Sequence, residues 1–297
     1  MKHGLIAVSM WVMMLVPSIA WSTGAERAQQ GVIAAGAGHF ALAIRWFSQA
    51  LESNDLDPVD RLVVLNNRAV ALKSLGRYQA SIDDLDMLLR QEPNNAKARY
   101  NRGTVYFIIG RYNDAAWDFA EFVRLRPERS SPYPYLWLVL ARMRAGLEWR
   151  ELLEEKNEYL KQFDWPYPIV AFHLGDLDSE GVLKEADRVL VEDRFGRKVD
   201  ALFHLAHASW NNGDVADSKR FLKELVSLGR RSHMSEVIAA RESLKRLSVG
   251  VATSEMIEHK EIKSAGKKME ENSRHYDLLQ SLFDGLLLRS SSERAVH

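Results

Sequence analysis

Apolar residues recur every three or four positions through most of this chain, a pattern typical of amphipathic helices that each bury one face. No segment alternates apolar and polar residues with a period of two, so we expect no β-sheet. The helical pattern repeats. Gly76 and Gly110 are 34 residues apart, as are Pro93 and Pro127, and similar residues lie between them in both copies. The matching positions are Tyr78, Ser81, Ile82, Leu85, Leu88 and Leu89 in one copy, and Tyr112, Ala115, Ala116, Phe119, Phe122 and Val123 in the next.

Two further copies are visible, one around Gly38-His39-Phe40 and one around Gly213-Asp214-Val215. Small residues recur where two helices of a unit would cross closely, namely at Gly31, Ala69 and Gly103. Each helix pair leaves an apolar face that only a neighbouring pair can bury, so the units should stack into one solenoid.

The residues at these spacings resemble the tetratricopeptide repeat, a helix-turn-helix unit of 34 residues. The resemblance implies an all-α, right-handed superhelical solenoid followed by a C-terminal helical tail. We expect a signal peptide at 1–22, three repeats at 23–130, degenerate and further helical repeats at 131–250, and a charged tail with a terminal amphipathic helix at 251–297.

The N-terminus predicts export. Lys2 and His3 precede an apolar run from 5 to 16, and Ser18 and Ala20 provide a small-residue cleavage site. The mature protein would then be periplasmic or secreted. The alternative is an uncleaved inner-membrane anchor, although the run is shorter than the roughly 20 residues that a membrane span prefers.

Composition excludes several functions. Forty Lys and Arg balance forty Asp and Glu, so no overall basic field favours nucleic acid as a partner. The chain has no cysteine, which excludes disulfides, thiolate chemistry, Cys-ligated zinc and lipidation through a thiol.

A second resemblance comes from the order of several motifs, which is similar to that of the bacterial lipoprotein NlpI family. The motifs are Tyr100-Asn101-Arg102-Gly103, Leu136 to Ala141, Trp165 with Ile169 to Gly175, and Gly213-Asp214. The resemblance implies a non-enzymatic periplasmic adaptor whose partners include peptidoglycan-cleaving enzymes and a tail-specific protease. The chain departs from that family because no cysteine follows the signal sequence, so we expect a soluble, unlipidated form.

Four residues are candidates for binding a peptide in a concave groove. Asn67 and Asn101 occupy the same repeat position, where an amide can both donate to and accept from an extended backbone. Lys97 and Lys73 would add charge for an acidic side chain or a terminal carboxylate. The alternative for Asn67 is a hydrogen bond to a neighbouring helix.

Catalytic motifs are weak. His204 and His207 are three residues apart with Asp200 one turn earlier, which is a conceivable metal-binding arrangement, and His204 is expected to face the groove. No HExxH, nucleophile elbow or phosphate loop occurs, so we predict no catalytic residues, metal or cofactor. Two alternatives to the adaptor remain: a structural subunit of a secretion or outer-membrane complex, and a hydrolase that uses His173, His204 and His207.

The tail carries an apolar stripe of Tyr276, Leu279, Phe283 and Leu286 after a highly charged segment. We expect this stripe to cap the last repeat, or else to dock on a partner or on a second copy in a homodimer.

Overall fold

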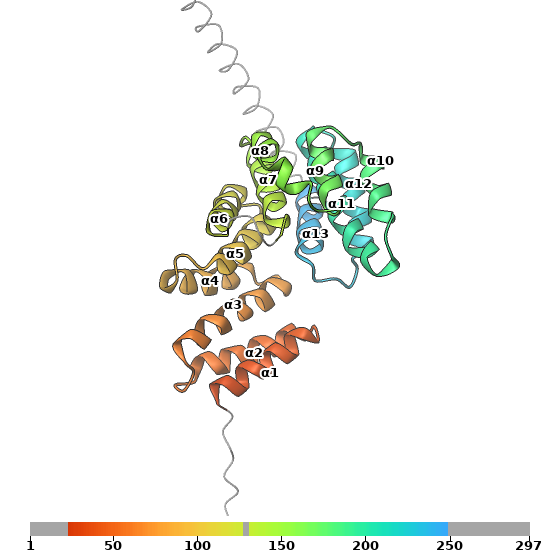
Figure 1. The fold of residues 1–297 in the computed structure, drawn as a ribbon. Coiled ribbons are helices and arrows are strands. Elements are labelled where there is room, and N and C mark those ends of the chain that lie inside the picture. The colour runs from red at the N-terminus through yellow and green to blue at the C-terminus, as the bar shows by residue number, and fades with distance from the viewer. Residues whose placement is uncertain (1–22, 127–130, 249–297) are drawn as a thin grey trace, which may run out of the picture.

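The computed structural model describes residues 23–126 and 131–248, which form thirteen helices and no strand. The first six helices form three consecutive pairs (Figure 1): α1 (Gly24–Gly36) with α2 (Phe40–Glu52), α3 (Pro58–Ser74) with α4 (Tyr78–Gln91), and α5 (Ala96–Ile109) with α6 (Tyr112–Leu125). Seven helices follow: α7 (Tyr133–Ala145), α8 (Arg150–Leu160), α9 (Tyr167–Leu174), α10 (Ser179–Asp187), α11 (Val191–Asn211), α12 (Val215–Leu228) and α13 (Ser235–Ser248). The predicted all-α helix-turn-helix solenoid is confirmed.

The turns between paired helices are made by glycines in the left-handed region. A residue without Cβ adopts this backbone conformation at no steric cost and ends the preceding helix. All six positive-φ residues of the described chain are glycines just after a helix, with φ between 73° and 94°: Gly38, Gly76, Gly110, Gly146, Gly175 and Gly213. The glycines that marked the repeats in the sequence therefore mark its turns.

The small residues lie where helices cross closely, as the sequence predicts. A Cβ added to Gly31 would lie 2.4 Å from the Phe47 ring, and one added to Gly103 would lie 3.0 Å from the Phe119 ring. Phe47, Phe119 and Ala69 are completely buried. A larger side chain at either glycine would push the two helices of the pair apart.

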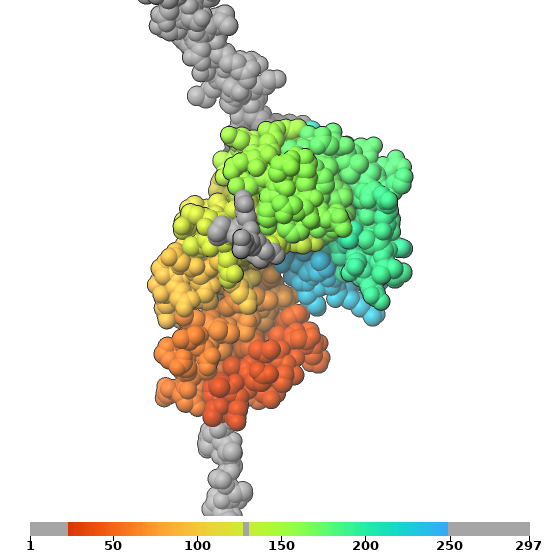
Figure 2. All heavy atoms as spheres, in the orientation of Figure 1, coloured from red at the N-terminus to blue at the C-terminus, as the bar shows by residue number. Residues whose placement is uncertain are grey.

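The C-terminal half does not simply extend the array, because α13 returns to the first repeats. Figures 1 and 2 show α13, in blue, beside the yellow and orange helices, and α13 packs on α5. Arg246 donates to the Ile108 carbonyl (2.8 Å) and to Tyr112 Oη (3.2 Å), and Tyr78 Oη donates to Glu242 (3.1 Å). These bonds join residues more than 130 positions apart and hold α13 against α4, α5 and α6.

The expected pair at Tyr135 to Ala145 and Trp149 to Phe163 is present as α7 and α8, with the break at Gly146. The apolar segment after Trp165 forms the short α9, and Ser235 begins α13 as expected. Sequence patterning missed α10 and the first two turns of α11, where few side chains are buried: Val182 and Ala186 in α10, and none in α11 before Val199.

Three predicted features lie outside the described residues: the signal peptide, the amphipathic stripe of the tail and Pro127. Within 23–126 and 131–248, no helix combines the length and the apolarity needed to cross a membrane.

Candidate functional site: a groove along the first helices

In each of two successive repeats, an arginine–aspartate pair joins the two helices of that repeat. Arg68 binds Asp84 with two bonds of 2.7 Å, and Arg102 binds Asp118 with bonds of 2.7 and 2.8 Å. Both arginines are 34 residues apart, and so are both aspartates, so the pair is part of the repeat. Such two-pronged bonds fix orientation as well as distance. They hold α4 against α3 and α6 against α5.

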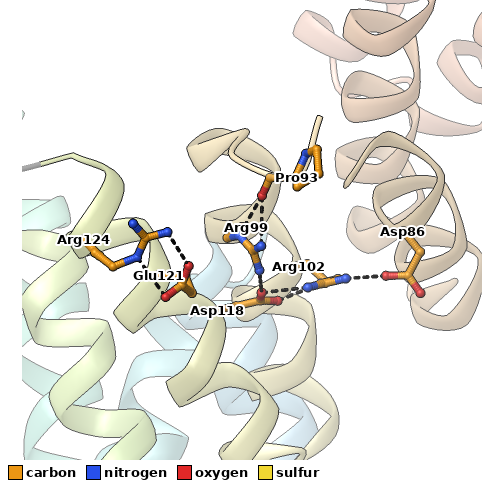
Figure 3. Close-up of polar contacts among 7 residues, drawn as sticks. All are labelled: Asp86, Pro93, Arg99, Arg102, Asp118, Glu121 and Arg124. Carbon is orange, nitrogen blue, oxygen red and sulfur yellow. Dashed lines mark hydrogen bonds and ion pairs between the residues drawn. The ribbon is translucent and has the colours of Figure 1, made fainter. Parts of the chain in front are cut away.

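In the second of these repeats the pair extends into a network (Figure 3). Arg102 also binds Asp86 of α4 at 2.6 Å, which links one repeat to the previous one. Arg99 binds Asp118 at 3.3 Å and donates to the Pro93 carbonyl at 2.9 and 3.2 Å. The network therefore fixes the loop between α4 and α5, and this loop lines a pocket.

That pocket, here called the α3–α5 pocket, has a volume of about 680 Å³. Apolar side chains of α3 form one wall, and the loop at 92–95 forms another. Val59 and Val63 are 66% and 53% exposed, so apolar surface of α3 is open to solvent in this pocket. Its lining comprises Val59, Leu62, Val63, Asn66, Leu88, Glu92, Pro93, Asn94, Asn95, Ala96, Lys97, Leu125 and Arg126.

A second pocket, here called the α5–α11 pocket, has a volume of about 860 Å³ and lies between α5, α7, α11 and α13. Aromatic rings and charged groups alternate around it. The lining comprises Lys97, Tyr100, Phe122, Arg126, Ser131, Tyr133, Pro134, Trp165, Asp193, Gly196, Arg197, Asp200, Met234 and Glu236.

Lys97 and Arg126 line both pockets, so the two adjoin and form one groove. Both side chains are exposed. The groove thus has a basic midpoint, an apolar arm beside α3 and an aromatic arm that leads to the carboxylates of α11 and α13. Of the four residues predicted from the sequence, Lys97 is the one that lines the groove.

The two asparagines are placed differently from each other. Asn101 donates its amide N–H to Asn66 Oδ1 at 2.7 Å, a bond between α5 and α3. Asn66 is buried and lines the α3–α5 pocket, whereas its neighbour Asn67 is half-buried and does not line either pocket. The structure therefore brings Asn101 together with Asn66, which the 34-residue spacing does not identify.

Lys73 contacts the chain's own C-terminal helix. Its side chain is buried, and its Nζ donates to Ser235 Oγ at 2.8 Å. Burial lowers the pKa of Lys73 to about 8, although attraction to Glu236 opposes this. The helix α13 covers this lysine. The contact joins residues 162 positions apart, so local sequence patterning cannot reveal it.

The three histidines are in the core, so the expectation that His204 faces the groove is wrong. His173 Nε2 and His204 Nδ1 lie 3.0 Å apart, and His207 Nδ1 lies 3.2 Å from Arg144. Asp200 faces Tyr133 and Trp165 instead. Among the described residues, no three His, Cys, Asp or Glu side chains are grouped so that they could hold a metal.

Sequence reasoning missed the aromatic arm and its carboxylates. Tyr100, Trp165 and Asp200 belong to separate motifs of the sequence, and they lie on α5, in the turn before α9 and on α11, respectively. Tyr133 and Glu236 carried no signal.

The fold and the groove define a helical-repeat protein with an open groove along its first helices. Residues 66–130 match the family model of the tetratricopeptide repeat, so the repeats predicted from the sequence are confirmed in this segment.

Solved structures with the same kind of fold are distant. A tetratricopeptide repeat protein from Parabacteroides merdae is 15% identical, with a TM-score of 0.47 over 73% of this chain and 84% of that one. The C-terminal part of a repeat protein from Cytophaga hutchinsonii is 18% identical, with a TM-score of 0.38 over 74% of each chain. YrrB, described as a repeat protein with an unusual peptide-binding site, is 16% identical, with a TM-score of 0.32 over 67% of this chain and 97% of that one.

Proposed function

We propose that this protein is a non-enzymatic adaptor of the cell envelope that binds extended segments of other proteins in the groove. The observation that carries the proposal is the continuity of the two pockets at Lys97 and Arg126. Together they provide a recess of about 1,500 Å³ that has both apolar and charged lining. A segment of several residues fits such a groove better than a small rigid ligand does.

Charge supports a peptide as the occupant. Lys97 and Arg126 would meet an acidic side chain or a terminal carboxylate at the midpoint, while Val59 and Val63 would cover an apolar side chain in the α3–α5 pocket. The proposed envelope location rests on the signal-like N-terminus. The proposed partners, peptidoglycan-cleaving enzymes or a periplasmic protease, rest on the resemblance to the NlpI family.

Photo-crosslinking from two positions tests the proposal. A benzoylphenylalanine in place of Phe122, in the groove, should capture a partner in cells, whereas one in place of Ile33, which is 56% exposed on α1, should not. Mass spectrometry of the adduct identifies the captured segment. A homodimer would appear as an adduct between two copies.

A synthetic peptide with the captured sequence then gives the affinity. Changing Lys97 or Arg126 to Ala should weaken its binding roughly tenfold to a hundredfold, because a charged hydrogen bond contributes about 1.5 to 3 kcal/mol. Arg124→Ala is the matched control, because Arg124 is two residues from Arg126 but binds Glu121 outside the groove (Figure 3). Equal capture from both positions, or equal affinities for all three variants, would contradict a role for the groove.

A further inference from the structure

Asp200 is a buried carboxylate at the aromatic end of the α5–α11 pocket. It is 7% exposed, and its Oδ2 accepts bonds from Tyr133 Oη and Trp165 Nε1, each 3.0 Å long. Its other oxygen, Oδ1, accepts no hydrogen bond from a described residue. Glu236 of α13 lines the same pocket. Burial, and to a lesser extent the charge of Glu236, raises the pKa of Asp200 to about 7.

Within the described chain, no basic side chain forms an ion pair with Asp200. Arg197 lines the pocket, but its guanidinium lies over the Trp165 ring, 5.3 Å from the ring centre. Lys73 instead interacts with Glu236. Burial raises the pKa of Glu236, and the positive charge of Lys73 opposes this in part. A buried carboxylate that is held only by neutral donors is costly unless a cation pairs with it. The site therefore has a buried carboxylate without a cationic partner, and a bound cation would favour its ionised form.

The walls around Asp200 suit a cation that arrives on an apolar stem. Tyr100 and Tyr133 line the pocket beside Trp165, and their rings attract a positive charge placed over their faces. A lysine or arginine side chain could lay its methylene groups along these rings and bring its charge to the carboxylates. An acidic side chain would instead be repelled by two carboxylates and is better placed at Lys97 and Arg126.

The geometry points to a cation subsite at Asp200 and Glu236, which binds a basic side chain of the peptide held in the groove. This inference rests on the proposed function, and it adds a requirement for the ligand. The groove would select segments that carry a basic residue, which binds at the α11 end. This requirement is in addition to any acidic group that binds at Lys97 and Arg126. The subsite would thus fix both the sequence preference and the direction of the bound segment.

NMR of the ¹⁵N-labelled protein can test this with defined probes. The indole N–H signal of Trp165, assigned by its loss in Trp165→Phe, reports directly on Asp200 because the two groups are hydrogen-bonded. The probes are three blocked peptides, acetyl-Gly-Ala-Lys-Ala-Gly-amide and its norleucine and glutamate analogues. Measurements at pH 8 keep Asp200 ionised, because its pKa is about 7.

We expect the lysine peptide to shift the Trp165 and Gly196 signals at millimolar concentration, and the norleucine and glutamate peptides to bind at least about tenfold more weakly at these positions. Asp200→Asn keeps the size and the hydrogen-bond acceptor but loses the charge, so it should weaken the lysine peptide at least about tenfold. Asp193→Asn removes the same charge from an exposed position of the same pocket and should change the affinity less than twofold. The spectra themselves report whether each variant is folded.

Two kinds of failure can be told apart. If the lysine and norleucine peptides shift the same signals equally, or if Asp200→Asn binds like the wild type, the cation subsite is refuted while the groove stands. A stronger effect of the glutamate peptide on Trp165 would also refute it, and would assign this end to anions through Arg197. If the segment captured from Phe122 shifts no signal in either pocket, the proposed function fails together with the subsite.

Discussion

Replacing Asp118 with alanine should destabilise the protein strongly, because two arginines lose their shared partner. Asp118 is completely buried, and the side chains of Arg99 and Arg102 are only 11% and 14% exposed. Removal of one member of a buried ion pair leaves the other charge without compensation, which typically costs about 3 to 5 kcal/mol. Arg102 retains Asp86 and Arg99 retains the Pro93 carbonyl, so we expect a cost near the lower end, about 3 kcal/mol.

The matched control is Asp114→Ala, one turn earlier on the same helix. Asp114 also binds an arginine, Arg111, at 2.7 Å, but the two side chains are 46% and 49% exposed. An exposed pair of this kind contributes at most about 1 kcal/mol, so the control should cost much less than Asp118→Ala. Both variants remove a carboxylate from α6, and therefore the difference between them measures burial.

Urea unfolding followed by circular dichroism at 222 nm gives the free energies. A third variant, Asp118→Leu combined with Arg102→Met, replaces Asp118 and one of its two arginines with apolar groups. It should recover part of the loss, because only Arg99 is then left without its carboxylate. If Asp118→Ala is no more destabilising than Asp114→Ala, or if the double variant is worse than the sum of its single changes, the network does not hold α5 and α6 together as argued.

Two further predictions concern packing and pH. Gly31→Ala should lower the free energy of unfolding by more than about 1 kcal/mol, because its Cβ would lie 2.4 Å from Phe47. Gly36→Ala is the control and should not, because no atom lies within 4 Å of its Cβ. Equal shifts of the two variants in thermal melts would contradict a tight crossing of α1 and α2. Burial lowers the pKa of His173 from 6.5 to about 4, so the unfolded chain binds the extra proton between these values and stability falls as pH drops below 6.5. From pH 6.5 to 5, His173→Gln should lose about 1.5 kcal/mol less than the wild type in urea titrations, and parallel losses would show that His173 is not buried as a neutral ring.

The sequence by itself determined the helical pairs and their turns. Gly76 and Gly110 end the first helices of their pairs, and Gly31 and Gly103 allow the close crossings, because these effects depend on residues within one repeat. Recurrence at a 34-residue spacing made each local pattern more informative than it would be alone. The same spacing also relates Arg68 to Arg102 and Asp84 to Asp118, so the buried ion pairs were visible in principle.

Only the tertiary structure determined which helices form the groove and which residues line it. Lys73 meets Ser235 across 162 positions, and Asp200 meets Tyr133 across 67 and Trp165 across 35. None of these separations matches the repeat, so no periodic signal connects the partners. They come together because α13 returns to α5 and because α7, α9 and α11 share one apolar core. That core forms because apolar side chains are buried together, and this attraction has no direction. It can therefore set the arrangement of the helices although the sequence contains no motif that links the polar residues of the groove.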